Sequence, residues 1–105
     1  MNMQTNLANQ STKDNLQEQK RQQIIQSWYE PALNLLNKML ERNKANLRKR
    51  GYNEDNAAIT REEFRQELAR QGCITLYLAG EIETSLYKAQ KIEYMGGYVK
   101  PKEMQ

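Results

Sequence analysis

The main helix that the sequence predicts runs from residue 28 to residue 50, where apolar side chains recur every three or four positions. These side chains form two adjoining stripes. The first contains Leu33, Leu36, Leu40 and Leu47, and the second contains Ile25, Trp28, Ala32, Leu35 and Met39. Together the stripes make a face wider than a two-stranded seam requires. Cations at positions 48–50 suit the end of a helix, and Gly51 is placed to terminate it.

The start of this helix has two interpretations. Ser27 and Glu30 have the spacing of a capping box, and Pro31 follows in what would be the first helical turn, where a missing N–H costs nothing. In that case a new helix begins at Trp28. The alternative is one long helix that bends at Pro31.

The N-terminal region is rich in Gln and Asn. Residues 1–12 show no hydrophobic periodicity, so we expect them to form a flexible tail. Ser11 and Asp14 resemble a weak capping box and predict that a polar helix begins there.

The second half of the chain opens with the clearest local signal. Thr60 and Glu63 form a capping box, and Ile59 and Phe64 flank it as a hydrophobic staple. We predict a helix from this box to Gln71 that stops at Gly72.

The segment from residue 73 to residue 95 is ambiguous at its start. Residues 74–78 alternate as a strand would, but the sequence offers no second strand to pair with them. Helical spacing instead continues through Ile74, Leu78, Ile82, Leu86, Ala89 and Ile92. We therefore predict a helix that ends at Gly96 and Gly97, followed by an extended or free tail.

The fold class predicted from these elements is all-α. We expect a small bundle of three or four helices, with a flexible tail over 1–12, a single helical domain over 13–96 and a C-terminal tail over 97–105. A domain of this size buries a low fraction of its surface, so its apolar supply is thin. Self-association would add burial.

The composition excludes several kinds of chemistry. The chain has 105 residues, no His, one Cys and a formal net charge of +3. Without His there is no imidazole base, and with Cys73 alone there is no internal disulfide. We expect no enzymatic activity, no cofactor and no metal, and we expect Cys73 to be a small buried side chain.

The same sequence predicts a cytoplasmic protein with no membrane partner. It has no apolar run long enough to span a bilayer and no secretory signal at its start. A single unpaired Cys is typical of a reducing compartment.

The first functional hypothesis is a small interaction protein that acts as a regulator, adaptor or inhibitor of a protein partner. Such small, amide-rich helical proteins are frequent in phages and mobile elements. The first stripe can be covered within the chain by Phe64, Leu68, Ile74, Leu78, Ile82 and Leu86. The second stripe then has few intramolecular partners, which predicts a homodimer or a partner interface at Ile25, Trp28, Ala32, Leu35 and Met39.

The alternative hypothesis is a nucleic-acid-binding accessory protein. The end of the main helix carries cations that would attract phosphates, and a tyrosine that would stack on a base. These residues are Arg42, Lys44, Arg48, Lys49, Arg50 and Tyr52.

A specific form of that alternative is a helix–turn–helix made of the helix over residues 60–71, the turn at Gly72 and Cys73, and the helix that follows. The start of its second helix lacks the side chains that read base edges. The residues there are Ile74, Leu76, Tyr77, Leu78 and Glu81. This favours an ordinary pair of helices. Tyr87 and Tyr94 are seven residues apart with Lys91 between them, a mixture that suits the rim of a core, a protein interface or single-stranded nucleic acid.

Overall fold

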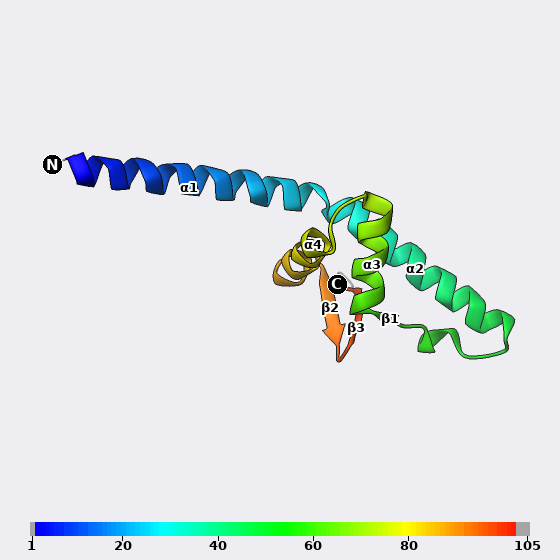
Figure 1. Ribbon diagram of the computed structural model, residues 1–105. Helices are drawn as coiled ribbons and strands as arrows, with labels where there is room; N and C mark the ends of the chain where they lie inside the picture. Colours follow the sequence, from blue (N-terminus) through cyan, green and yellow to red (C-terminus); the bar gives the residue numbers. More distant parts are fainter. Residues whose placement is uncertain (1, 103–105) are drawn as a thin grey trace.

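The computed structural model describes the backbone of residues 2–102 and the side chains of residues 15–102. The chain forms the helices α1 (Asn2–Ser27), α2 (Tyr29–Lys49), α3 (Arg61–Gly72) and α4 (Leu76–Lys88), with a short 3₁₀ turn η1 (Glu54–Asn56). Three strands complete it: β1 (Ile59–Thr60), β2 (Ile92–Met95) and β3 (Tyr98–Pro101). Figure 1 shows α1 extending away from a body formed by the other elements.

The all-α prediction is confirmed only in part, because the chain is mostly helical but its C-terminal region forms a small antiparallel sheet. β2 and β3 make an antiparallel hairpin and β1 pairs with the other edge of β3, in the order β1-β3-β2. Helical spacing continues past Lys88, but α4 ends there and Gln90 adopts a positive φ of 61°. Gly96 takes the positive φ that a tight hairpin loop needs, so Gly96 and Gly97 turn a hairpin and do not end a helix.

The predicted C-terminal tail is extended, as one alternative had it, but it is paired in the sheet, and the predicted N-terminal tail lies in α1 over its described residues. Residues 98–101 form β3, and the backbone N–H of Lys102 donates to the Lys91 carbonyl. At the other end α1 begins at Asn2, so the backbone of residues 2–12 is helical and no helix starts at Ser11. The side chains of the predicted cap at Ser11 and Asp14 lie outside the described residues.

The structure contains two helices at this point and not one bent helix, and Trp28 marks the break between them. It stands between α1 and α2, and its backbone N–H donates to the Ile25 carbonyl at 3.0 Å. The expected capping box does not form, because the Ser27 hydroxyl donates to the Ile24 carbonyl instead. Pro31 lies in the first turn of α2, where its missing N–H leaves no helical bond unmade.

The core joins α2, α3, α4 and the sheet, and it uses both stripes of α2. Most of the second stripe is buried, and so is Leu36 of the first, whereas Leu33 and Leu40 are only partly covered. The sheet contributes one buried apolar side chain from each strand, and the prediction of a C-terminal tail left no place in the core for Val99. The buried apolar residues are Ile25, Ala32, Leu35, Leu36, Met39, Ile59, Phe64, Leu68, Ala79, Ile82, Leu86, Ile92 and Val99.

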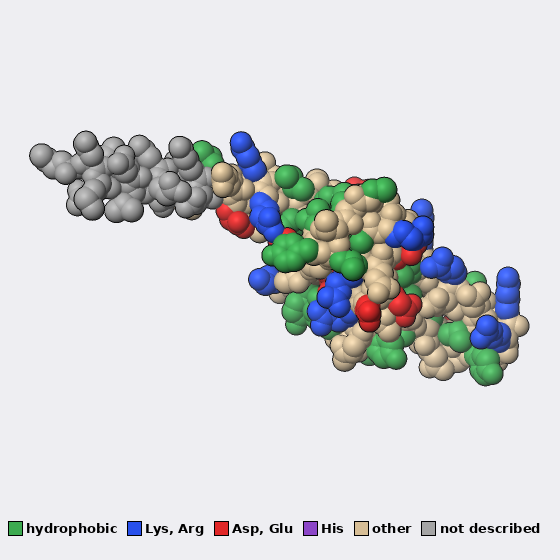
Figure 2. All heavy atoms as spheres, in the orientation of Figure 1, with side chains coloured by type: hydrophobic (Ala, Val, Ile, Leu, Met, Phe, Trp, Pro, Cys, Tyr) green, Lys and Arg blue, Asp and Glu red, His purple; other side chains and the backbone are tan. Residues whose placement is uncertain are grey.

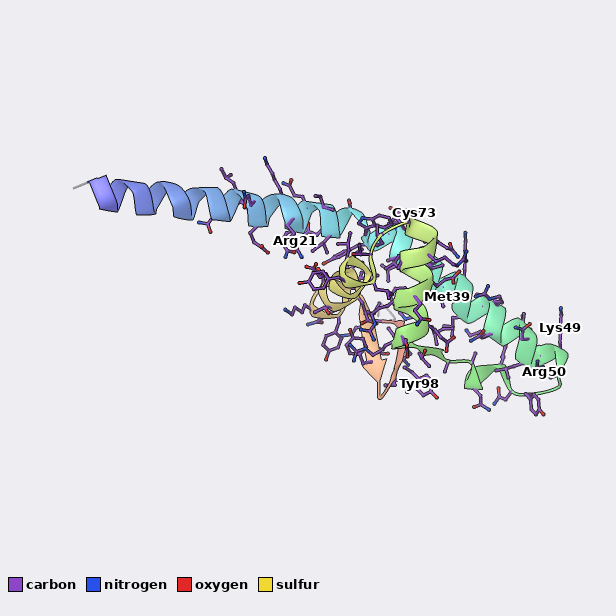
Figure 3. All side chains as sticks on the ribbon, viewed as in Figure 1. Arg21, Met39, Lys49, Arg50, Cys73 and Tyr98 are labelled. Carbon is purple, nitrogen blue, oxygen red and sulfur yellow. The ribbon has the colours of Figure 1, made fainter. Side chains whose placement is uncertain are left out.

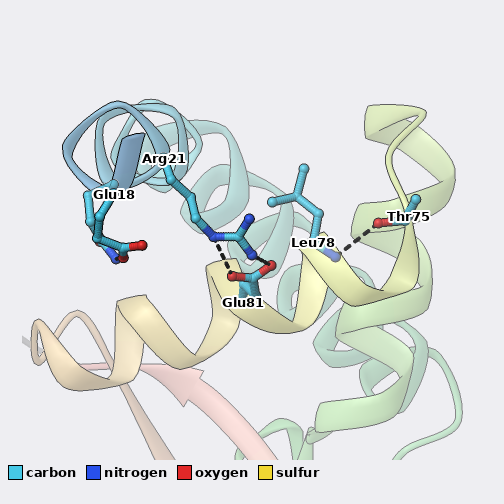
Figure 4. Close-up of polar contacts among 6 residues, drawn as sticks. Glu18, Arg21, Thr75, Leu78 and Glu81 are labelled. Carbon is cyan, nitrogen blue, oxygen red and sulfur yellow. Dashed lines mark hydrogen bonds and ion pairs between the residues drawn. The ribbon is translucent and has the colours of Figure 1, made fainter. Parts of the chain in front are cut away.

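A threonine side chain caps the start of each of the helices α3 and α4, and a short turn joins the two helices. Thr60 accepts a hydrogen bond from the Glu63 backbone N–H at 3.0 Å, as predicted, and α3 ends at Gly72. Cys73 adopts a left-handed φ of 53° and is exposed, not buried as expected. Thr75 then caps α4 by accepting from the Leu78 N–H at 3.0 Å (Figure 4).

Gly72 also has a packing role. A Cβ placed on it would lie 2.9 Å from the Trp28 ring, so the indole rests directly on the end of α3. In residues 2–102 no helix combines the length and the apolar character needed to cross a membrane.

Candidate nucleic-acid interface

The predicted partner interface lies in the interior of the single chain. Ile25, Ala32, Leu35 and Met39 are buried, and Trp28 is half-buried against Gly72. The premise of that prediction, that the chain lacks groups to cover this stripe, is therefore wrong. Four of the five side chains are buried within the folded chain, and Trp28 is partly covered by Gly72, so the stripe does not form an open surface.

The predicted basic surface is exposed at the end of α2, where Figure 3 labels Lys49 and Arg50. Part of its charge is neutralised locally. Arg48 pairs with Glu54, and Lys44 lies 3.6 Å from Glu41.

Tyr52 is also exposed, in the loop that follows α2. Arg50 and Tyr98 line a nearby hollow of about 350 Å³ together with Asn43 and Asn46. The predicted residues are thus brought together at one helix end, with their charge partly offset.

A second surface, which we call the α4 face, consists of the exposed side chains of α4 with their neighbours from α1, α3 and the hairpin. Tyr77 is 75% exposed, and Leu76, Thr84, Tyr87 and Lys88 are also exposed. A groove of about 680 Å³ crosses this face, lined by residues of α4, by Gln22 and Ile25 of α1 and by Arg65 of α3. Figure 2 shows cationic and hydrophobic side chains interleaved over this part of the body.

An ion pair fastens α1 to the α4 face. The Arg21 guanidinium donates twice to the Glu81 carboxylate, through Nε to Oε2 at 3.1 Å and through Nη2 to Oε1 (Figure 4). The hydrogen bond to Glu81 raises the pKa of Arg21. Glu81 is the carboxylate on the solvent side of α4, so this pair neutralises the negative charge that would otherwise repel an anion there.

A buried carboxylate lies behind the α4 face. Glu83 is only 1% exposed, and its Oε1 is 3.4 Å from Nη2 of Arg61 and 3.7 Å from Nε of Arg65. Burial raises the pKa of Glu83, and the two guanidinium groups oppose that rise. Oε2 of Glu83 and Nε of Arg61 are buried without a hydrogen-bond partner. The cluster thus holds two arginines from α3 beside α4.

Aromatic stacking joins the hairpin to α4. The Cζ atom of Arg61 lies 3.9 Å from the centre of the Tyr94 ring. That ring stacks on Tyr87 with centroids 4.3 Å apart and planes 14° apart. The sequence placed the two tyrosines on one helical face. The structure instead brings them together across α4 and β2.

The side chains described in residues 15–102 include no group of three or more His, Cys, Asp or Glu residues arranged to hold a metal ion. Comparison of the chain with protein families, curated proteins and solved structures finds no match.

Proposed function

We propose that this protein binds double-stranded DNA through the α4 face and the adjoining hairpin, without enzymatic activity. The observation that carries the proposal is the arrangement of α3, the Cys73 turn and α4 on a sheet that ends in a hairpin. This order of elements is the topology of a winged helix–turn–helix, in which the second helix of the pair lies against the major groove. The analogy concerns the fold alone, so the chemistry of the surface has to support it independently.

The charges on the α4 face support this proposal. Arg65, Lys88 and Lys91 surround the exposed part of α4, and Arg61 lies at its edge. Of the two carboxylates on α4, Glu81 is paired with Arg21 and Glu83 lies between two arginines. The surface offered to a phosphate backbone is therefore cationic, although the whole chain carries only +3.

The same surface offers little for reading bases. Thr75 is occupied as a helix cap, and Ser85 hydrogen-bonds to Tyr29. Tyr77 and Thr84 are the polar groups left near the start and middle of the exposed side of α4. Because phosphate contacts position a protein and base contacts specify the site, we propose binding with low sequence specificity.

The test is a titration of the full chain with a fluorescent duplex at several salt concentrations. We expect the protein to bind the duplex at low salt. The association constant should fall by about one power of the salt concentration for each phosphate contact. A chain that leaves duplex DNA unbound at tens of micromolar protein in low salt contradicts the proposal, and so does an affinity that is independent of salt.

Protein binding is the second candidate, and it retains the regulator, adaptor or inhibitor role predicted from the sequence. It is favoured by exposed apolar side chains near the junction of α1 and α4, namely Ile24, Leu76 and Tyr77. Light scattering distinguishes a homodimer from a monomer. A mass that remains that of one chain at tens of micromolar contradicts the homodimer.

A further inference from the structure

Three planar groups form a continuous stack at the edge of the α4 face. The Cζ atom of Arg61 lies 3.9 Å from the centre of the Tyr94 ring, and the centre of the Tyr87 ring lies 4.3 Å from it. Arg61 lies over the Tyr94 ring and Tyr87 stacks on the same ring, so Tyr94 is the middle member of the stack. Tyr87 is therefore the last member of the stack, and it is 47% exposed. Within residues 15–102, Tyr94 is the ring that stacks on it.

The stack is held rigidly from behind by three elements. Glu83 of α4 lies against the Arg61 guanidinium, and the Arg61 backbone N–H donates to the Gly97 carbonyl in the hairpin loop at 2.9 Å. α3 thus supplies the cation, β2 the middle ring and α4 the outer ring. A ligand that stacks on Tyr87 meets a preformed surface, so little ordering opposes binding.

Two exposed lysines lie close to Tyr87 in the chain. Lys88 follows Tyr87 on α4, and Lys91 follows in the turn before β2; both are exposed. Neither forms an ion pair with a side chain in residues 15–102. A flat aromatic surface with free cations beside it suits a nucleotide, whose base stacks while its phosphate meets the lysines.

We propose that the outer face of Tyr87 is a stacking site for an unpaired nucleobase. A base inside a continuous duplex is already stacked on both sides, whereas a base at a single-stranded end has a free face. The protein therefore prefers a duplex with a single-stranded overhang to the same duplex with blunt ends. Stacking accepts any base, so this preference is for structure and not for sequence. The inference rests on the proposed DNA binding.

The experiment compares three DNA probes that share one duplex: a blunt end, an overhang of normal nucleotides and an overhang of abasic nucleotides. The two overhangs carry the same phosphates, so their difference isolates stacking. We expect the normal overhang to bind about fivefold to a hundredfold more tightly than the abasic one, the range that one base–aromatic stack supplies. A 2-aminopurine in the overhang should lose fluorescence on binding.

Variants of Tyr87 make the test specific. Tyr87→Phe keeps the ring and should keep the preference. Tyr87→Leu should remove both the preference and the fluorescence change. The preference is the ratio of the affinities for the two overhang probes, so a loss of duplex affinity that is common to both probes does not change it. Tyr77→Leu is the matched control, because it removes an exposed tyrosine from the same helix without touching the stack. Circular dichroism checks that each variant is folded.

Two outcomes overturn the inference. In one, the wild-type protein binds the normal and abasic overhangs equally. In the other, Tyr87→Leu is folded and retains the preference. A wild-type protein that binds the blunt duplex without any preference contradicts this inference alone, whereas one that binds none of the probes contradicts the proposed function as well.

Discussion

The end of α2 and the α4 face are both cationic, but they are built differently. At the end of α2 the cations follow one another along a single helix, and Glu41 and Glu54 neutralise two of them. On the α4 face the cations come from α1, α3, α4 and the turn before β2, and a buried carboxylate and stacked rings hold two of them in place. A dense run of charge along one helix therefore differs from a charged surface whose cations come from several elements and are held by buried contacts.

The largest expected difference between the two surfaces is in DNA affinity. Lys88→Glu with Lys91→Glu should weaken duplex binding about 100-fold at physiological salt, where charges more than about 8 Å apart are largely screened. Lys49→Glu with Arg50→Glu changes the net charge equally and should weaken binding less than about threefold. Fluorescence anisotropy measures both. Equal losses in the two double variants would show that the affinity for DNA depends only on the net charge of the protein.

A second difference concerns stability. Glu83→Ala should lower the free energy of unfolding by about 2 kcal/mol, because it leaves Arg61 without the carboxylate that it pairs with. The expected loss is below that of a fully buried pair, since both arginines are more than a third exposed. Glu54→Ala at the end of α2 breaks an exposed pair and should cost less than about 0.5 kcal/mol. Urea unfolding of the two variants is the measurement, and similar losses would contradict the comparison.

The link between α1 and α4 should have a smaller effect on DNA binding. Arg21→Ala uncovers the Glu81 carboxylate on the α4 face and should weaken duplex affinity about fivefold. Adding Glu81→Gln should restore most of that loss. Arg48→Ala is the matched control, because it removes an arginine paired with an exposed glutamate at the end of α2. If Glu81→Gln restores nothing, Arg21 does not act by neutralising Glu81.

The smallest expected effect is a pH dependence of stability. Burial raises the pKa of Glu83, so the folded state holds the proton more tightly than the unfolded state does. The contribution of this group to stability is thus greatest below the ordinary pKa of Glu, about 4.3, and is lost as the pH rises through the raised pKa. The wild type should therefore lose stability relative to Glu83→Gln as the pH increases from about 4 to 7. Urea unfolding at both pH values measures this, and a constant difference would contradict the assignment.

Local signals in the sequence predicted part of this fold. The cap at Thr60, the end of α3 at Gly72 and the end of α2 near Arg50 depend on neighbouring residues, and the structure contains all three. The sheet was missed because Ile92 continues the helical spacing of α4 as well as the alternation of β2. Pairing of β2 with β3, and of β3 with the distant β1, decides between these readings, and a spacing rule contains no information about such pairing.

The candidate site was harder to predict for the same reason. The prediction assigned residues 97–105 to a tail, so it did not count Val99 among the side chains of the core. It therefore treated the second stripe of α2 as uncovered. Tyr94 and Arg61 are more than thirty residues apart, and only the fold brings them into one stack. The lysines and tyrosines of this region were visible in the sequence, but their common surface was not.

The most direct test of the account is amide hydrogen exchange of the full chain with and without duplex DNA. If DNA binds the α4 face, exchange should slow in the exposed part of α4 and in the hairpin, over residues 76–98, and stay unchanged over residues 42–52. The account is contradicted if bound DNA slows exchange at residues 42–52 and leaves α4 and the hairpin as they are in the free protein.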